Sequence, residues 1–228
     1  MTGDQRELTD TIADNLAPLK PALRGWLHAG TLPLACAAGL VLIILAPTRA
    51  ARTAAVVFGS ASILLFGISA LYHRLHWRSR AKGLLRRLDH ANIFVMIAGT
   101  YTPFAVLLLR GTDRTTLLIA AWAGAALGVM FRLLWVAAPR WLYTPIYLAL
   151  GWVAIFWLPA FYHRGGGIAV ALLIAGGILY SLGAIVYGLK KPNPSPHWFG
   201  FHEIFHACTV AAFVTHYIAA SIITYQSA

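Results

Sequence analysis

Two histidines, His202 and His206, lie four residues apart near the start of the last apolar segment of the chain. Residues at i and i+4 lie on one face of a helix about one turn apart, so both imidazoles can bind the same metal ion. With Glu203 between them, the letters also spell H-E-x-x-H, a zinc metalloprotease motif in which the glutamate is the general base. Because polar side chains are costly within a membrane, such a cluster indicates a function.

The composition is that of an integral membrane protein. Of the 228 residues 59% are hydrophobic and 11% charged, with a mean hydropathy of +0.70, which is too apolar for a soluble domain. A formal net charge of +11 would suggest nucleic acid as the partner of a soluble protein. Here the basic residues lie in short loops between apolar runs. We therefore expect no nucleic-acid partner, and interpret these residues as topology signals and contacts for anionic lipid head groups.

Seven apolar runs are long enough to cross a membrane, for which a helix needs about 20 residues. They cover residues 26–46, 53–76, 88–109, 115–137, 141–162, 167–189 and 199–224. We predict an all-α, polytopic domain of seven transmembrane helices over residues 25–228. Residues 1–24 form a tail whose pattern fits either a short interfacial helix or a frayed polar segment.

The distribution of Lys and Arg predicts the orientation. The N-terminal tail and the second, fourth and sixth loops hold twelve of these residues, and the remaining loops hold five. The positive-inside rule therefore places the N-terminus in the cytoplasm and the C-terminus outside, the reverse of G-protein-coupled receptors. Arg132, the one basic residue not included in this count, is near the cytoplasmic end of the fourth run, and we interpret it as a snorkelling side chain.

This topology brings other polar residues to the depth of His202. The second run ends near His73 and the third begins near Asp89, both on the cytoplasmic side. Together with His206, three imidazoles and a carboxylate suffice for a tetrahedral zinc site with a fourth position for water or carboxylate. Ser69 lies one turn before His73 on the same face, where its hydroxyl can approach the metal's water or orient a ligand.

The other histidines carry weaker signals. His90 points roughly 100° away from Asp89 on a helix, so it is secondary. His216 is ten residues beyond His206, about 15 Å along a helix, and is a candidate for the lining of an outer cavity. The remaining four are more typical of packed or interfacial side chains: His28, His76, His163 and His197.

Three ordered motifs resemble the hemolysin III branch of the progestin and adipoQ receptor family, over about residues 25–225. The motifs are Ser69-x3-His73, then Asp89-His90-Ala91-Asn92-Ile93 running into Ala98-Gly99-Thr100-Tyr101-Thr102-Pro103-Phe104, then Phe201-His202-Glu203-Ile204-Phe205-His206. The resemblance implies a seven-helix protein of the bacterial plasma membrane with a cytoplasmic N-terminus. It also implies that His73, His202 and His206 bind zinc, and that Asp89 binds it through a water molecule. Ser69 matches a serine of the wider superfamily, which includes alkaline ceramidases.

Two functions fit these features best. The first is a zinc-dependent hydrolase of amide or ester bonds in membrane lipids, in which Asp89 accepts a proton from water and Ser69 assists the oxyanion. The alternative is a non-enzymatic membrane-homeostasis or receptor-like protein whose zinc only ties three helices together. A pore-forming cytolysin is disfavoured because no polar stripe crosses the membrane, and a protease because His73 already supplies a third ligand. The substrate and the oligomeric state stay open.

Overall fold

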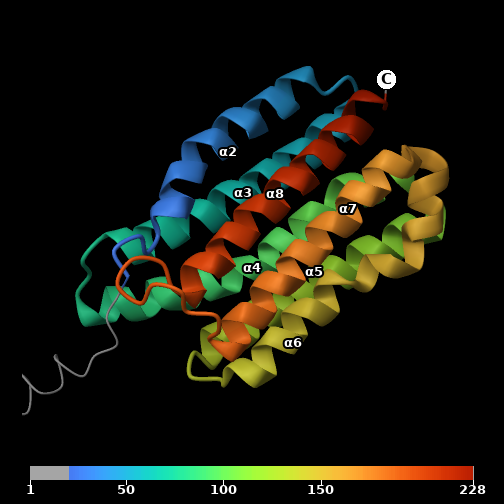
Figure 1. The fold of residues 1–228 in the computed structure, drawn as a ribbon. Helices are drawn as coiled ribbons and strands as arrows, with labels where there is room; N and C mark the ends of the chain where they lie inside the picture. Colours follow the sequence, from blue (N-terminus) through green and yellow to red (C-terminus); the bar gives the residue numbers. More distant parts are fainter. Residues whose placement is uncertain (1–20, 228) are drawn as a thin grey trace, which may run out of the picture.

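The computed structural model describes residues 21–227, which form helices and no β-strand (Figure 1). Residues 1–20 of the predicted N-terminal tail lie outside the described residues. The elements are α2 (Trp26–Leu45), α3 (Arg49–Arg74), α4 (Ser79–Leu108), α5 (Gly111–Leu134), α6 (Arg140–Gly151), the 3-10 helix η1 (Val153–Trp157), α7 (Leu158–Leu189) and α8 (Phe201–Tyr225). The all-α prediction is confirmed, and six helical stretches are long and apolar enough to cross a membrane.

The fifth and sixth predicted runs form one continuous helical stretch in which the chain reverses. Arg140 Nη1 donates to the Tyr187 carbonyl at 3.2 Å, and Trp152 Nε1 donates to Ser181 Oγ at 2.9 Å, so the two halves lie side by side. Figure 1 shows them as the yellow α6 beside the orange α7. Inside α7, Gly166 has a φ of 81°, a left-handed conformation that glycine adopts without steric cost. The reversal therefore occurs without the loop expected there.

Several helices begin before the predicted runs, and the difference is large for α4. α4 begins at Ser79, nine residues before the predicted start at 88, so the basic residues 80–87 lie on a helix and not in a loop. α3 begins at Arg49, four residues before the predicted start at 53, because Thr48 caps the helix and accepts a hydrogen bond from the Ala51 N–H at 3.1 Å.

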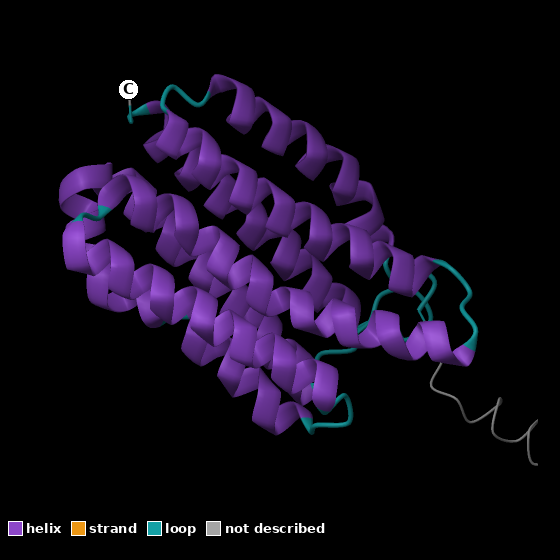
Figure 2. Cartoon of the chain, turned by 180° about the vertical axis from the view of Figure 1, so that it is seen from behind, coloured by secondary structure: helices purple, strands orange, loops and turns teal. Residues whose placement is uncertain are grey.

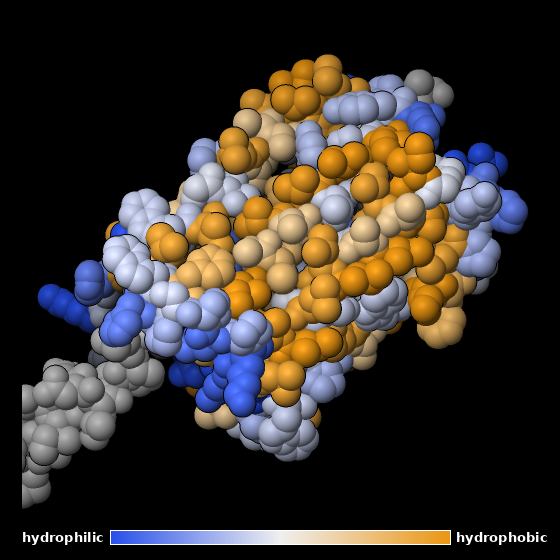
Figure 3. Space-filling view, in the orientation of Figure 1, coloured by the Kyte–Doolittle hydropathy of each residue, from blue (hydrophilic) through white to orange (hydrophobic). Residues whose placement is uncertain are grey.

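Large apolar side chains cover the outside of the bundle. Leu34 is 69% exposed, Leu134 78% and Phe156 80%. Figure 3 shows an apolar belt across the visible face with hydrophilic side chains at both ends. In the opposite view, the helices run along one common direction (Figure 2). An apolar surface this continuous does not suit water, and it fits the hydrocarbon core of a bilayer.

The central helix is α4, in which every residue from Ala98 to Ala105 is buried. It contacts α3, α5, α6, α7 and α8. Close approach to α3 depends on Gly99, where an added Cβ would lie 2.5 Å from the Ala61 Cβ. Small residues at such crossings let the backbones pack closely, which is the usual basis of helix association in lipid. The packing of α4 thereby sets the position of Asp89 near its start.

Candidate metal centre

The three predicted histidine ligands come together at one end of the bundle. His73 lies in the last turn of α3, and His202 and His206 lie in the first two turns of α8. All three side chains are buried, and each offers a ring nitrogen within 4.8 Å of the other two. The Nε2 atoms of His73 and His202 are 3.4 Å apart. Three imidazole nitrogens this close together can hold a metal ion, so the donor set fits one.

Asp89 and Ser69 lie beside this trio. Asp89 Oδ2 is 3.6 Å from His73 Nε2, and the Asp89 side chain is 11% exposed. The buried Ser69 hydroxyl interacts with Asp89, although it makes no hydrogen bond of normal geometry with a described residue. One turn after Asp89, Asn92 Nδ2 donates to the Leu64 carbonyl at 3.1 Å and joins α4 to α3. The fold therefore gathers the predicted site residues, while their chemical roles stay predictions.

His28 is a fourth buried histidine at the cluster, which the sequence assigned to packing. Its ring stacks on that of His206, with centroids 3.8 Å apart and planes at 5°. Neither of its ring nitrogens has a hydrogen-bond partner within residues 21–227. α2 can approach because Gly25 has a φ of 81°, and a Cβ there would lie 2.5 Å from the His73 Cβ. No sequence pattern indicates this contact, since it depends on how α2 packs against α8.

The carboxylate of Glu203 already has two partners at the start of α8. Its carboxylate pairs with Arg24 Nε and accepts the backbone N–H of Gly200 at 2.8 Å. The Glu203 side chain is 1% exposed. Both carboxylate oxygens are therefore engaged, one by a guanidinium and one by the backbone N–H at the N-cap of α8, so Glu203 has a structural role at the start of this helix. The protease interpretation of H-E-x-x-H therefore loses its base.

The interpretation of Arg132 as a snorkelling side chain is wrong. Arg132 is 0% exposed, and its guanidinium lies over the Tyr143 ring, 4.3 Å from the centroid. Its Nη2 lies 2.7 Å from His90 Nδ1 and also donates to the Val136 carbonyl at 3.3 Å. Because guanidinium only donates, His90 Nδ1 accepts, and in the neutral ring Nε2 carries the hydrogen. That Nε2 lies 3.5 Å from the Tyr187 hydroxyl, so a chain of polar contacts links α5, α4 and α7.

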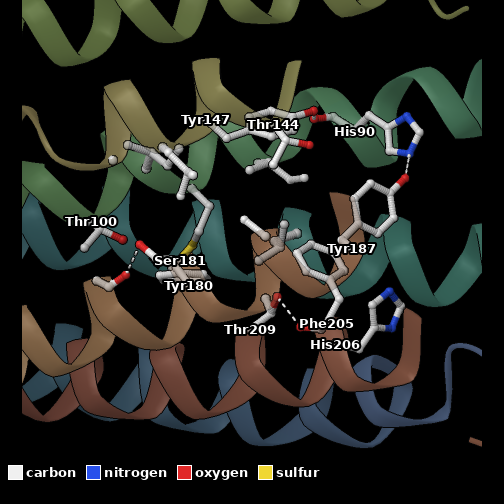
Figure 4. Close-up of a pocket in the computed structure, with 18 of the residues that line it drawn as sticks. His90, Thr100, Thr144, Tyr147, Tyr180, Ser181, Tyr187, Phe205, His206 and Thr209 are labelled. Atoms are coloured by element: carbon white, nitrogen blue, oxygen red, sulfur yellow. Dashed lines mark hydrogen bonds between the residues drawn. The ribbon is translucent and has the colours of Figure 1, made fainter. Parts of the chain in front are cut away.

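One cavity adjoins His202, His206 and Asp89. Its wall includes Asp89 and His206 and extends as far as His216. The cavity has a volume of about 110 Å³, which is several times the space that one water molecule needs. Its lining is mostly apolar. Figure 4 shows Tyr187 and His206 toward one end of this space and Thr100 toward the other. The candidate metal centre is thus one wall of an elongated, mainly apolar chamber.

These features define a class: a polytopic helical membrane protein with a buried histidine cluster beside an internal cavity. A family model for haemolysin-III related proteins matches residues 17–217 of the chain. The chain therefore belongs to the haemolysin III-related family, as its three motifs predicted. It is an integral, multi-pass membrane protein, which we assign to the plasma membrane.

Individual relatives agree with this assignment. The chain is 39% identical over 146 residues to the hemolysin-3 homolog of Bacillus subtilis (strain 168), covering 64% of this chain and 68% of the relative. It is 38% identical over 155 residues to hemolysin-3 of Bacillus cereus, covering 67% and 70%. A more distant relative, the heptahelical transmembrane protein ADIPOR2 of Oryza sativa subsp. japonica, is 30% identical over 186 residues, covering 73% and 80%. This last match links the chain to the wider progestin and adipoQ receptor family.

Proposed function

We propose that the protein is a zinc-dependent hydrolase that cleaves an amide or ester bond of a membrane lipid. One observation carries the proposal: three buried histidine nitrogens lie within 4.8 Å of one another beside the carboxylate of Asp89, and His202, His206 and Asp89 line a mainly apolar cavity. Apolar cavities with a few convergent polar groups are the usual form of small-molecule sites.

His73, His202 and His206 would hold the zinc ion. Three protein ligands with a fourth position left open are typical of catalytic zinc, whereas structural zinc is usually enclosed by four. When bound there, zinc supplies a Lewis acid that polarises a carbonyl group and makes water more acidic. The donors come from the end of α3 and the start of α8, so both helices must be folded before the site exists.

Asp89 and Ser69 would carry the proton transfers. Asp89 Oδ2, 3.6 Å from His73 Nε2, lies close enough to contact a water molecule held by the histidines. We expect Oδ2 to take the proton of the water that attacks the carbonyl carbon, and to return it to the amine or alcohol that leaves when the amide or ester bond breaks. The Ser69 hydroxyl would donate a hydrogen bond to the oxygen of the attacked carbonyl. Burial strengthens both interactions, since little solvent screens them.

Membrane lipids are the substrate class that the cavity favours. Its mostly apolar lining suits hydrocarbon chains, and the surface around it is the apolar face of the bundle. Anionic lipid head groups would contact the basic residues at the helix ends. A long-chain amphiphile would then place its polar bond at the histidines and its chain along the cavity.

We also infer that the chain crosses the membrane seven times, with the N-terminus in the cytoplasm and the C-terminus outside. The pairing of Arg140 with Tyr187 and of Trp152 with Ser181 supports two crossings within residues 140–189. The rice relative, described as heptahelical, agrees with that number. The excess of basic residues at one set of helix ends supports the direction, which puts the histidine cluster near the cytoplasmic side.

The test combines metal analysis with lipid turnover. We expect purified wild-type protein to carry about one zinc ion per chain and His202→Ala to lose it, whereas His163→Ala, which changes an exposed histidine, keeps it. Asp89→Asn should retain zinc and lose about 100-fold or more of its turnover in a screen of amide- and ester-linked lipids. Wild-type protein without zinc, or wild-type turnover in Asp89→Asn, would overturn the proposal.

The alternative is a non-enzymatic membrane-homeostasis protein with a structural zinc. Its support is that the histidine trio joins the end of α3 to the start of α8, two elements separated by more than a hundred residues of chain. This alternative is favoured if zinc-loaded protein turns over no lipid, and if His206→Ala unfolds while Asp89→Asn keeps the cellular phenotype of the wild type.

A further inference from the structure

The cavity has a second polar cluster far from the histidine trio. Thr100 of α4, Tyr180 of α7 and His216 of α8 all line the same cavity. His216 is ten residues beyond His206 on α8, which corresponds to about 15 Å at the helical rise. Figure 4 shows Thr100 and Tyr180 near each other and remote from His206, at the opposite end of the view.

The His216 ring presents a hydrogen-bond acceptor in this cluster. Its Nε2 lies 3.0 Å from the Leu173 carbonyl oxygen, and a carbonyl only accepts, so Nε2 carries a hydrogen. A charged imidazole at this depth would need an anionic partner, and among residues 21–227 no carboxylate forms an ion pair with His216. In the neutral ring, Nδ1 therefore offers only a lone pair. It is buried and has no hydrogen-bond partner among the described residues.

The two hydroxyls are also left without internal partners. Elsewhere in these helices, Ser62, Thr102 and Thr209 donate to the carbonyl four residues earlier, at 2.8 to 2.9 Å. Within the described chain, the hydroxyls of Thr100 and Tyr180 make no such bond, although both oxygens are buried. Three helices thus each contribute a buried polar atom without a partner to this cavity, and leaving such atoms unbonded is energetically costly.

We propose that Thr100, Tyr180 and His216 form a second subsite that binds a hydroxyl group on the hydrocarbon chain of the lipid. The proposal rests on the hydrolase function, and it narrows the substrate class to hydroxylated long-chain lipids. A hydroxyl both donates and accepts, so it can satisfy His216 Nδ1 and one of the two protein hydroxyls together. Carboxylates, phosphates, esters and ketones only accept and leave Nδ1 unsatisfied.

The chain length follows from the separation of the two ends. The cavity wall also includes the apolar side chains of Met96, Ile97 and Phe205. A distance of about 15 Å corresponds to roughly a dozen carbons between the polar bond and the hydroxyl. The ligand therefore has one polar group at each end of the cavity and methylene groups between.

Matched fatty acids test this subsite, because a fatty acid is one product of hydrolysing a fatty amide or ester. The probes are acids of about 12 to 16 carbons that carry a hydroxyl group, a keto group or no substituent on the penultimate carbon. Binding to purified, zinc-loaded protein is measured by competition with a fluorescent fatty acid. At the best length, we expect the hydroxy acid to bind about tenfold tighter than both the keto and the unsubstituted acid.

Variants at Thr100 and Tyr180 test whether these residues cause the tighter binding of the hydroxy acid. Thr100→Val and Tyr180→Phe each remove a hydroxyl group, and at least one of them should reduce the preference for the hydroxy acid while the unsubstituted acid binds as before. Tyr162→Phe, at a residue that is 58% exposed, is the matched control and should keep the full preference. Equal binding of the three acids, or a preference that survives both cavity variants, would overturn the subsite and leave the hydrolase proposal intact. If no acid binds and no lipid is turned over, both proposals fail.

Discussion

The ion pair between Glu203 and Arg24 allows a direct test of whether Glu203 stabilises the fold or takes part in chemistry. Glu203→Gln keeps the side-chain size and an oxygen that can accept the Gly200 N–H. It removes the charge that pairs with Arg24. Because the Arg24 side chain is only 18% exposed, the variant leaves a largely buried guanidinium without its counter-ion.

The expected loss of stability follows from this burial. Removing one partner of a buried ion pair costs about 3–5 kcal/mol, and the partial exposure of Arg24 favours the lower figure. For a protein of this size, about 3 kcal/mol corresponds to a decrease of roughly 6–12 °C in the unfolding midpoint. Glu203→Ala also loses the hydrogen bond at the start of α8, which adds about 1 kcal/mol.

Thermal unfolding in detergent, followed by fluorescence-detected gel filtration, measures these shifts. Arg24→Gln and the double variant Arg24→Gln/Glu203→Gln complete a cycle in which we expect a coupling of at least about 1 kcal/mol. Arg114→Gln, which changes an exposed arginine, is the control and should unfold near the wild-type temperature. Folded Glu203→Gln should keep its zinc. If it unfolds like the wild type but loses lipid hydrolysis with zinc bound, Glu203 is a catalytic base and our reasoning is refuted.

Two further variants test the packing and the buried arginine by the same unfolding assay. Gly99→Ala places a Cβ 2.5 Å from the Ala61 Cβ and should destabilise the protein by about 1–3 kcal/mol. Gly83→Ala, where the added Cβ meets no atom within 4 Å, should be neutral or slightly stabilising. Equal changes in the unfolding midpoint for Gly83→Ala and Gly99→Ala would contradict the close contact between α3 and α4. Arg132→Met leaves His90 Nδ1 without its donor and should cost about 2–3 kcal/mol. A wild-type midpoint for Arg132→Met would show that the guanidinium is dispensable.

The helices and the approximate depth of the site residues follow from local features of the sequence. A run of about 20 apolar residues must be helical in lipid, since only a helix satisfies its backbone polar groups within the run. The four-residue spacing of His202 and His206 puts both on one helix face whatever the helix packs against. Helices that alternate in direction bring His73, Asp89 and His202 to the same end of the bundle, where the structure also has them.

Local features were less informative where the chain reverses or where a charged residue is helical. The break within residues 140–189 falls at Gly166, between the fifth and sixth predicted runs, but it is a kink between helical segments and not the loop expected there. The basic residues 80–87 were expected in a loop, because composition does not distinguish a polar helical extension from a loop at the membrane surface.

Only the tertiary structure decided which side chains meet. Arg24 pairs with Glu203 across 179 positions of sequence, and Arg132 reaches His90 across 42. The sequence places a residue at a depth along its helix, but the rotation of that helix toward its neighbours depends on the packing of many distant side chains. For this reason the contacts of His28 and Arg132, and the partners of His216 in the cavity, emerged only from the fold, whereas the histidine pair of α8 was evident from its spacing.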